Sequence, residues 1–271
     1  MNALSIIVVS FNARADLMAC LLSLKKGPPS VEHEIVVVDN ASTDGSAEAA
    51  ERVPGVRVVR MGRNAGFSAA NNAGIRESCG ELVLLLNSDT LVPPGALDRL
   101  IDRLRATREA AIAGPRLVDA DGRPELSFGR MIGPRAEWER KRTLRWIDGG
   151  SAAALHWLRN ETSREAFVDW VSGACLLVYR ADAEAAGLLD ERFFLYTEDV
   201  DFCHSVRRLG RRVLFTPAAE ITHLRGRSRA SQPVTSNAAY RRSHIAFYQK
   251  HHPWLAPLLR VYLRLKGERL S

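Results

Sequence analysis

The first half of the chain alternates continuous apolar runs with stretches whose apolar residues recur at helical spacing. The runs are LSIIVVS (4–10), EIVVVD (34–39), VRVVRM (56–61) and ELVLLLN (81–87). Such a run without alternation is typical of a strand buried on both faces of a parallel sheet. Helical spacing between the first two runs, as in Leu17, Leu21 and Leu24, predicts a crossover helix. The pattern predicts an α/β fold with a mostly parallel twisted sheet flanked by helices.

The second half is less regular. Apolar residues over 97–104 predict one more amphipathic helix, but residues 119–165 are rich in Arg, Asp and Gly, and we expect an irregular or helical insertion there. Strand-like composition returns over 166–180. The segment 197–210 predicts a helix with Thr197 as its N-cap and a glycine at its end.

Composition places the chain among ordinary globular proteins. It has 271 residues, 46% hydrophobic and 25% charged, which is enough for one large α/β domain or two small ones. Its four cysteines form no C-x-x-C pair and predict buried, reduced thiols, which favours a reducing compartment such as the cytoplasm. The N-terminal run reads as a first strand rather than a signal peptide, and no run approaches the ~20 apolar residues of a membrane-spanning helix.

The positive charge is concentrated at the C-terminal end. Residues 240–271 contain seven Lys or Arg and one acid, so they carry +6 of the formal net charge of +7. Aromatic and aliphatic residues are interleaved with these charges. This composition predicts either a peripheral contact with an anionic membrane surface or a helix packed on the domain with a solvated basic face. No zinc-finger, RNA-recognition or helix-turn-helix signature supports a nucleic-acid partner.

Polar clusters follow three of the predicted strands. Ser10, Phe11 and Asn12 end the first strand, Asp39 and Asn40 end the second, and Asn87, Ser88 and Asp89 end the fourth. In open α/β sheets, ligands bind at the carboxyl ends of the strands, near the point where the strand order reverses. Each cluster alone is equally typical of a turn or helix cap. Three of them at one sheet edge predict a binding site.

The clusters carry chemistry that suits a nucleotide. An aspartate such as Asp39 at a strand end can accept a hydrogen bond from a base N–H or a ribose hydroxyl. Asp89, with substrate phosphates and water, can hold Mg²⁺ or Mn²⁺, and His223 could complete the metal site. The arginines at 225, 227 and 229 are placed to meet phosphate charge, although a basic surface loop is the alternative.

Some motifs are missing. The sequence contains no G-x-x-x-x-G-K-[ST] loop, no G-x-G-x-x-G after the first strand, and no G-x-S-x-G elbow. A nucleotide would therefore be held by side chains and a metal rather than by a glycine-rich loop.

The stretch FFLYTEDVDF (193–202) sets three carboxylates directly after an aromatic run. A helix start accounts for Glu198 and Asp199, since acids favour the first turn. It leaves the preceding aromatic wall unexplained. A carboxylate beside such a wall could serve as a general base.

As a set, these motifs resemble the inverting GT-A glycosyltransferases of family 2. The segments that carry the resemblance are SIIVVSFN, VVVDNASTDGS, NAGFSAANNAGI, LLLNSDT, WVSGACLLVYR, FFLYTEDVDFCHSVRRLG and HLRGRS, in this order over residues 4–229. The FFLYTEDVDF and H-x-x-G-x-S forms look most like bacterial cell-surface rhamnosyltransferases, which use a dTDP-linked donor. The resemblance implies cell-wall or polysaccharide biosynthesis.

The resemblance implies a role for each matching residue. The nucleotide would be bordered by Phe11, Asn12, Asp39, Asn64, Gly66, Ser88 and Asp89. Mg²⁺ or Mn²⁺ would be held by Asp89 and His223. Trp170, Gly173 and Glu198 would border the sugar and acceptor, and Asp199 would be the catalytic base. The family's D-x-D motif begins with Asn87 here, which keeps an acceptor but loses a charge, so Asp89 remains its single metal ligand.

The resemblance also implies an organisation and a mechanism. Residues 1–230 would form the GT-A domain, with a nucleotide-binding half at about 1–115 and an acceptor-binding half at about 116–230, followed by a basic amphipathic helical segment over 231–271. A nucleotide-diphosphate sugar, dTDP-rhamnose or a UDP-sugar, would react in one displacement with a saccharide or lipid-linked hydroxyl. We expect the helix N-terminus to lower the basicity of Asp199. A catalytically silent binding module and a sugar nucleotidyltransferase are the alternatives.

Overall fold

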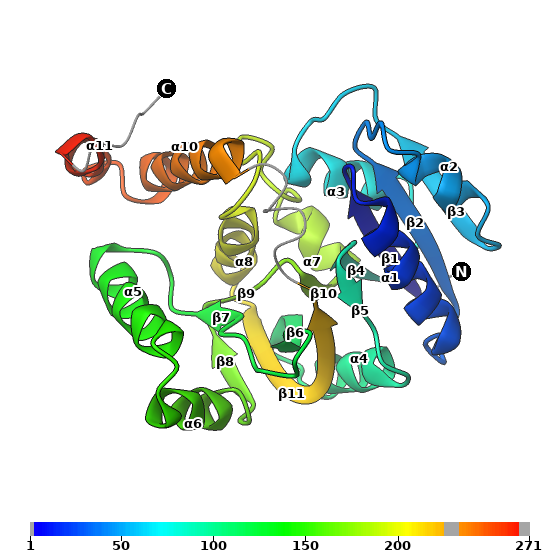
Figure 1. The fold of residues 1–271 in the computed structure, drawn as a ribbon, viewed down its shortest axis with the longest axis horizontal. Helices are drawn as coiled ribbons and strands as arrows, with labels where there is room; N and C mark the ends of the chain where they lie inside the picture. Colours follow the sequence, from blue (N-terminus) through cyan, green and yellow to red (C-terminus); the bar gives the residue numbers. More distant parts are fainter. Residues whose placement is uncertain (1–2, 225–232, 266–271) are drawn as a thin grey trace.

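The four apolar runs form neighbouring strands of one sheet in the computed structural model, which describes residues 3–224 and 233–265 (Figure 1). The nine strands of this sheet are β1 (Leu4–Ser10), β2 (His33–Asp39), β3 (Val56–Arg60), β4 (Leu82–Asn87), β5 (Thr90–Leu91), β6 (Ala110–Val118), β8 (Ala166–Val168), β10 (Cys175–Tyr179) and β11 (Arg212–His223). Two further strands, β7 (Phe128–Gly129) and β9 (Trp170–Val171), pair with each other.

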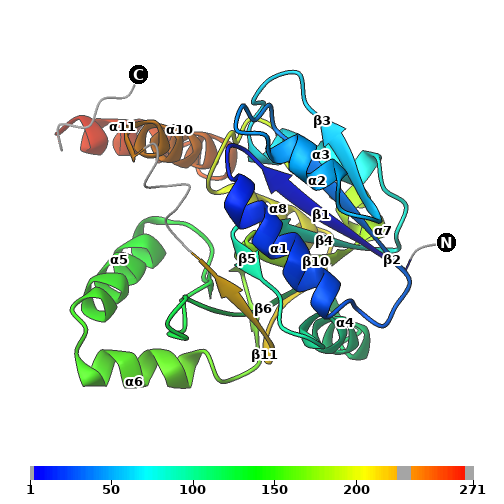
Figure 2. The same cartoon turned by 45° about the vertical axis from the view of Figure 1, so that its right-hand side comes forward.

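The helices connect and cover the strands. They are α1 (Arg14–Lys26), α2 (Ser46–Glu51), α3 (Phe67–Arg76), α4 (Ala96–Ala106), α5 (Pro134–Asp148), α6 (Ala152–Glu161), α7 (Arg180–Ala185), α8 (Glu198–Arg208), α10 (Pro233–His251) and α11 (Ala256–Leu265). The predicted insertion is thus helical over α5 and α6, which form a lobe beside the sheet (Figure 2).

The strand order runs β3-β2-β1-β4-β10-β6-β11-β5, with β8 paired to β11. Strands β3, β2, β1 and β4 are parallel, as predicted. Strand β10 is antiparallel to both of its neighbours, whereas β6 and β11 are again parallel to each other, so the sheet is mixed beyond β4. The chain leaves β1 toward β2 on one side and returns to β4 on the other. The strand order therefore reverses at β1, where a ligand is expected to bind.

Each face of the sheet carries its own core. Successive residues of a strand point to opposite faces, so Ile6 and Val8 pack with α1 and α4, whereas Ile7 packs with the helices on the other face. This second core includes residues of α3, α7, α8 and α10. Both cores consist of buried apolar side chains, which explains why β1, β2 and β4 lack alternation; β3, at the edge of the sheet, is only partly buried, contrary to the prediction of burial on both faces.

Helix α10 is part of the second core. Phe247 is fully buried and Tyr248 is 3% exposed. Glu137 of α5 accepts hydrogen bonds from the Tyr248 hydroxyl at 2.7 Å and lies 2.9 Å from Nε2 of His244. The aromatic residues of this half of the basic segment are thus used for packing. Within the described ranges, no helix is both long and apolar enough to cross a bilayer.

Candidate functional site

Three buried polar atoms lie at the carboxyl edge of the parallel strands. They are Oγ of Ser10, Oδ1 of Asp39 and Oδ1 of Asn87, and none has a hydrogen-bond partner in the protein. Ser10 is paired in register with Asp39, and Val9 with Asn87, so the three residues share one end of β1, β2 and β4. Buried polar atoms in proteins nearly always have partners. Their orientation at the reversal point therefore indicates a polar ligand.

The loop after β2 is held against the end of β1. Asn12, in the left-handed region at φ 50°, accepts a hydrogen bond from the Thr43 backbone N–H at 2.8 Å and donates its own N–H to the Ser42 hydroxyl at 2.9 Å. The Ser42 N–H in turn donates to Oδ2 of Asp39 at 3.0 Å. One Asp39 oxygen is fixed by the protein, and the other has no partner in it. Phe11 is partly buried beside this loop.

Asn64 and Gly66 form the next wall of the site. Asn40, which the sequence analysis gave no role, joins this wall to β2: its amide donates to Oδ1 of Asn64 at 2.9 Å and accepts from the Ala65 N–H at 2.9 Å. Gly66 has φ +90°, and a Cβ there would lie 2.6 Å from the carbonyl oxygen of Phe194. The segment before the predicted base, which contains Phe194, thus packs directly against the loop over residues 64–66.

Asp89 and His223 come together because β5 pairs with β11. Thr90 lies opposite His223 in the register, and Nε2 of His223 is 3.4 Å from Oδ1 of Asp89. The other ring nitrogen, Nδ1, is 3.3 Å from Oε2 of Glu125, a residue the sequence analysis missed because nothing in its surroundings marks it. Burial acts to lower the pKa of His223, but the hydrogen bonds and charges of both carboxylates outweigh it and raise the pKa to about 9.

This pair fits a divalent cation. A carboxylate oxygen and an imidazole nitrogen are suitable ligands for Mn²⁺, and the oxygen alone for Mg²⁺. Among the described residues, no group of three or more metal-ligating side chains is gathered. The remaining ligands would therefore come from a substrate and water. Ser88 is buried beside Asp89 and is 8% exposed.

The predicted base lies at the start of α8. Oδ2 of Asp199 accepts the N–H of Gly173 at 2.9 Å, and Oδ1 accepts the N–H of Val200 at 2.8 Å. Burial raises the pKa of Asp199 above its ordinary value, despite these bonds and the charge of Arg140. Lowered basicity was therefore the wrong expectation: desolvation of the carboxylate exceeds the stabilisation at the helix start.

Glu198 is buried more deeply than its neighbour. It is 6% exposed, and its Oε2 has no hydrogen-bond partner. Burial and the charge of Asp199 raise the pKa of Glu198 well above its ordinary value. Glu198 is thus the more buried of the two carboxyl groups, and Asp199 is the more accessible one.

The backbone before α8 is strained. Tyr196 and Thr197 have φ values of 69° and 65°, in the left-handed region that costs energy for side chains with a Cβ. Thr197 occupies the predicted N-cap position of α8, but its buried hydroxyl has no partner and makes no capping hydrogen bond. This conformation is fixed from outside: Ser68 Oγ donates to the Phe193 carbonyl and Ser243 Oγ to the Leu195 carbonyl, both at 2.8 Å.

Trp170, which was predicted to border the sugar and acceptor, is largely buried. It is 7% exposed, and its indole N–H donates to the carbonyl of Arg130 at 2.8 Å. The guanidinium of Arg140, a residue the sequence analysis missed, lies 4.6 Å from the ring centroid. Gly173 packs closely against the start of α8: a Cβ at this position would lie 3.3 Å from Cβ of Asp199.

Asp201 has a structural role. It is 1% exposed, accepts a hydrogen bond from Nζ of Lys250 at 2.8 Å, and lies 2.6 Å from Nε2 of His251. Lys250 also donates to Asp190 at 2.8 Å. The third acid of the stretch thus anchors α10 to α8, directly behind the predicted base.

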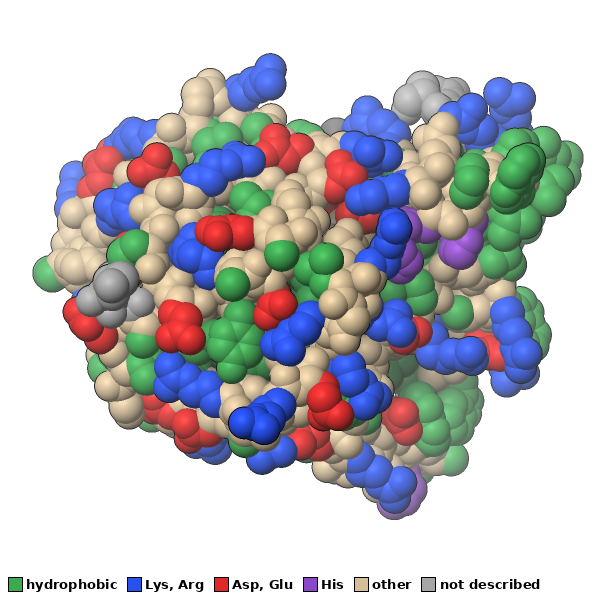
Figure 3. Space-filling view, turned by 180° about the vertical axis from the view of Figure 1, so that it is seen from behind, with side chains coloured by type: hydrophobic (Ala, Val, Ile, Leu, Met, Phe, Trp, Pro, Cys, Tyr) green, Lys and Arg blue, Asp and Glu red, His purple; other side chains and the backbone are tan. Residues whose placement is uncertain are grey.

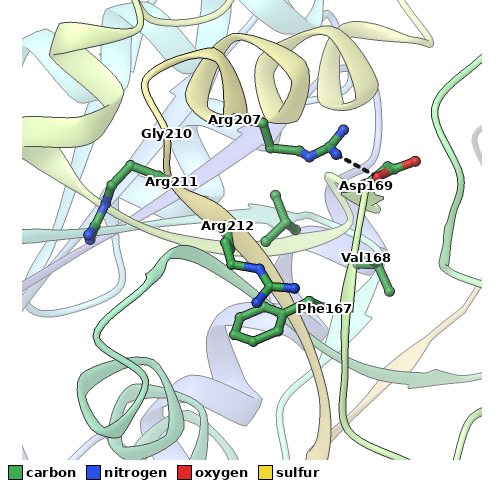
Figure 4. A pocket seen from close by; sticks show the side chains of 8 residues that line it. Phe167, Val168, Asp169, Arg207, Gly210, Arg211 and Arg212 are labelled. Atoms are coloured by element: carbon green, nitrogen blue, oxygen red, sulfur yellow. Dashed lines mark ion pairs between the residues drawn. The ribbon is translucent and has the colours of Figure 1, made fainter.

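A cavity of about 240 Å³ lies at the other end of α8, away from Asp199. Figure 4 shows Arg207 pointing toward Asp169, with which it pairs at 2.8 Å, and Arg212 stacked on Phe167. Arg207 and Arg212, which line this cavity, thus already contact protein side chains, and the cavity is separate from the candidate site. The predicted phosphate-binding arginines at 225, 227 and 229 lie outside the described residues.

The sequence of this chain is similar to those of known proteins of one family. Residues 5–167 match the family described as glycosyl transferase family 2. The chain is 31% identical to an N-acetylglucosaminyl-diphospho-decaprenol L-rhamnosyltransferase of Mycobacterium tuberculosis, over 95% of this chain and 88% of the relative. It is 29% identical to a low-salt glycan biosynthesis hexosyltransferase of Haloferax volcanii, over 77% of this chain and 62% of the relative.

Solved structures share the fold. A mannosyltransferase from Pyrobaculum calidifontis in complex with GDP-Man and Mn²⁺ superposes with a TM-score of 0.63 at 19% identity, covering 96% of this chain and 68% of that one. GalNAc-T7 with UDP, GalNAc and Mn²⁺ gives 0.61 at 17% identity, covering 83% and 43%. The expected GT-A fold is confirmed, and the chain belongs to glycosyl transferase family 2 and is a glycosyltransferase.

Proposed function

We propose that this enzyme transfers a sugar, with inversion, from a nucleotide-diphosphate donor to a hydroxyl group of a saccharide or lipid-linked acceptor. The sugar is rhamnose and the donor a dTDP-sugar. The similarity to the mycobacterial N-acetylglucosaminyl-diphospho-decaprenol L-rhamnosyltransferase supports the sugar and the acceptor class. One observation supports the mechanism: the Gly173 N–H fixes the carboxylate of Asp199 beside the Phe67 ring at the start of α3.

The donor would bind at the ends of β1, β2 and β4. The unpartnered Oδ1 of Asp39 would accept a hydrogen bond from a base N–H, and the Asn87 amide oxygen would accept one from a ribose hydroxyl. Asn12, Asn64 and Gly66 would hold the surrounding loops in place. The base N–H and the hydroxyl would satisfy groups that otherwise stay buried without partners.

Asp199 would act as the base. It takes the proton of the acceptor hydroxyl as that oxygen attacks the anomeric carbon, and the nucleoside diphosphate leaves from the opposite face. A single displacement inverts the anomeric centre, so one carboxylate base is enough. The raised pKa supports this task, because a more basic carboxylate accepts the proton earlier in the reaction.

Asp89 and His223 would hold Mn²⁺ or Mg²⁺. When bound, the cation would neutralise the charge of the departing diphosphate. His223 would have to lose its proton to bind, since only the neutral imidazole is a ligand. Glu125 would then accept the hydrogen bond of the other ring nitrogen and fix the orientation of the ring.

The test is a transfer assay with dTDP-rhamnose and a prenyl-diphosphate-linked N-acetylglucosamine, followed by NMR of the product anomer. We expect inversion, loss of turnover in EDTA with recovery in Mn²⁺ or Mg²⁺, and a loss of about 10²–10⁴-fold in Asp199→Asn. Retention of configuration or near-normal transfer by Asp199→Asn would refute the mechanism. Preference for a UDP- or GDP-sugar in a parallel panel would refute the donor. Donor binding without any turnover would indicate a catalytically silent module.

A further inference from the structure

Helix α11 has two apolar faces, and one of them lies in solvent. Ala256 and Leu263 are each 6% exposed and face the protein. The outer face consists of Leu258, Val261, Tyr262 and Leu265, preceded by Trp254; we call these five residues the α11 apolar stripe. Trp254 is 90% exposed and Leu265 is 83% exposed. The spacing of the four helical positions, i, i+3, i+4 and i+7, forms a continuous strip along the helix.

The charges beside this strip are basic. Arg260 and Arg264 are exposed on the same helix, and α11 contains no acidic residue. In Figure 3, hydrophobic side chains gather at the right-hand edge of the molecule, where α11 lies when seen from behind, with basic side chains next to them. An exposed strip that is both apolar and basic is complementary to a partner surface that is both apolar and negatively charged.

Helices α10 and α11 differ in how far their apolar side chains are buried. In α10, Phe247 and Tyr248 are buried, Tyr240 is half-exposed, and Lys250 is paired with Asp190 and Asp201. The buried aromatic side chains and the Lys250 ion pairs thus hold α10 against the rest of the protein. Among the described residues of the C-terminal segment, the exposed aliphatic side chains and Trp254 lie after His251, and in α11 they lie beside the exposed Arg260 and Arg264.

A second copy of the chain fits this face poorly. In a two-fold interface the same patch meets itself, which would bring Arg260 and Arg264 toward their own counterparts. Like charges at an interface cost energy. An anionic lipid surface has the opposite sign, and tryptophan favours the boundary between headgroups and acyl chains.

The position of α11 suits an acceptor held in a membrane. Ser243, in the middle of α10, bonds the loop that precedes Asp199. From Ser243 to His251, α10 rises by about 12 Å, and α11 follows after a short turn. A surface bound by α11 would therefore lie a few helical turns from the site.

We propose that the α11 apolar stripe docks the enzyme on an anionic lipid membrane, with Arg260 and Arg264 meeting lipid phosphates. Docking itself depends only on α11. The statement that docking presents a lipid-linked acceptor to the site rests on the proposed function.

The test is flotation of the full chain with vesicles of phosphatidylcholine, with and without phosphatidylglycerol. We expect binding to the anionic vesicles that weakens as salt is raised. Trp254→Ser with Leu258→Ser should reduce partitioning by about tenfold or more, and Arg260→Gln with Arg264→Gln by about tenfold. The matched controls are Leu22→Ser, an exposed leucine on α1, and Arg105→Gln on α4, which should bind like the wild type.

Equal binding to neutral vesicles, equal loss in the controls, or no vesicle binding would overturn the proposal. Concentration-dependent dimerisation abolished by the Trp254 and Leu258 changes would overturn it in favour of a second copy. Thermal shift with nucleotide sugars and transfer to a water-soluble acceptor keep this test separate from the proposed function. Both should be unchanged in the stripe variants, while transfer to an acceptor embedded in anionic vesicles should fall.

Discussion

The backbone N–H of Gly173 donates a hydrogen bond to Oδ2 of Asp199 at 2.9 Å. Two segments far apart in the sequence thus set the orientation of one carboxylate. A Cβ at position 173 would lie 3.3 Å from Cβ of Asp199 and 3.5 Å from Cε1 of Phe67. The first contact is tight, so even one added methyl group must displace the carboxylate by a few tenths of an ångström.

Gly173→Ala should therefore lower kcat by about tenfold, because a small misplacement of a reacting group is costly. The KM for the donor should change little, since the nucleotide would bind at the ends of β1, β2 and β4. Steady-state kinetics with varied donor measure both. A rise in donor KM with unchanged kcat would show that Gly173 serves binding instead.

The pH profile should show the raised pKa of Asp199. A base works only when deprotonated, so kcat/KM falls as the pH drops through its pKa. Because burial raises the pKa of Asp199, the fall should begin at a higher pH than for an ordinary aspartate. The charge of Arg140 acts in the opposite direction. Arg140→Gln should move this limb to still higher pH.

The matched control is Arg142→Gln, on the same helix, where the guanidinium covers the ring of Trp138 instead. Its profile should coincide with that of the wild type. Identical limbs in Arg140→Gln and the wild type would contradict the electrostatic role of Arg140.

Gly66→Ala should destabilise the protein and weaken donor binding. At φ +90° a side chain is strained, and its Cβ would meet the Phe194 carbonyl oxygen at 2.6 Å. We expect a loss of about 1–3 kcal/mol in the free energy of unfolding, measured by urea denaturation. Gly62→Ala is the control: it has no positive φ and nothing within 4 Å of the added Cβ, so it should be close to neutral.

Lys250→Met should break the anchor between α10 and α8. Asp201 is 1% exposed and would keep only the His251 contact, so we expect the free energy of unfolding to fall by about 2–4 kcal/mol. Arg135→Gln removes an exposed pair with Glu139 and should cost less than about 1 kcal/mol. Equal effects in the two variants would mean that burial adds nothing to the Lys250 pair.

Asp39→Asn should weaken donor binding by about tenfold or more. The Ser42 N–H requires an oxygen at one position of the side chain, so the amide nitrogen of Asn would face the ligand and oppose a base N–H. Isothermal titration with the nucleoside diphosphate measures the change. Unaltered affinity would exclude Asp39 from base recognition.

The sequence by itself determined the elements whose cause is local. Apolar runs specify β1, β2 and β4 because a strand buried on both faces needs apolar residues at almost every position, whereas β3 is an edge strand that is only partly buried. Asp39 ends β2, and Asp89 follows shortly after β4. Family motifs then indicated Asp199 and His223 as site residues, but their roles stay a prediction. The sequence also marked the C-terminal segment as basic and amphipathic without separating α10 from α11.

Tertiary structure decided whatever depends on pairing between distant segments or on burial. His223 reaches Asp89 only because β11 pairs with β5, and Glu125 joins them from an insertion with no recognisable pattern. Thr197 lies at the N-cap position that the sequence predicts, but the packing of the 193–197 segment holds it in a left-handed conformation in which its hydroxyl makes no capping hydrogen bond. The pKa of Asp199 is raised, whereas the sequence predicted that it would be lowered. The reason is desolvation, which depends on the surrounding fold and cannot be inferred from the order of residues along the chain.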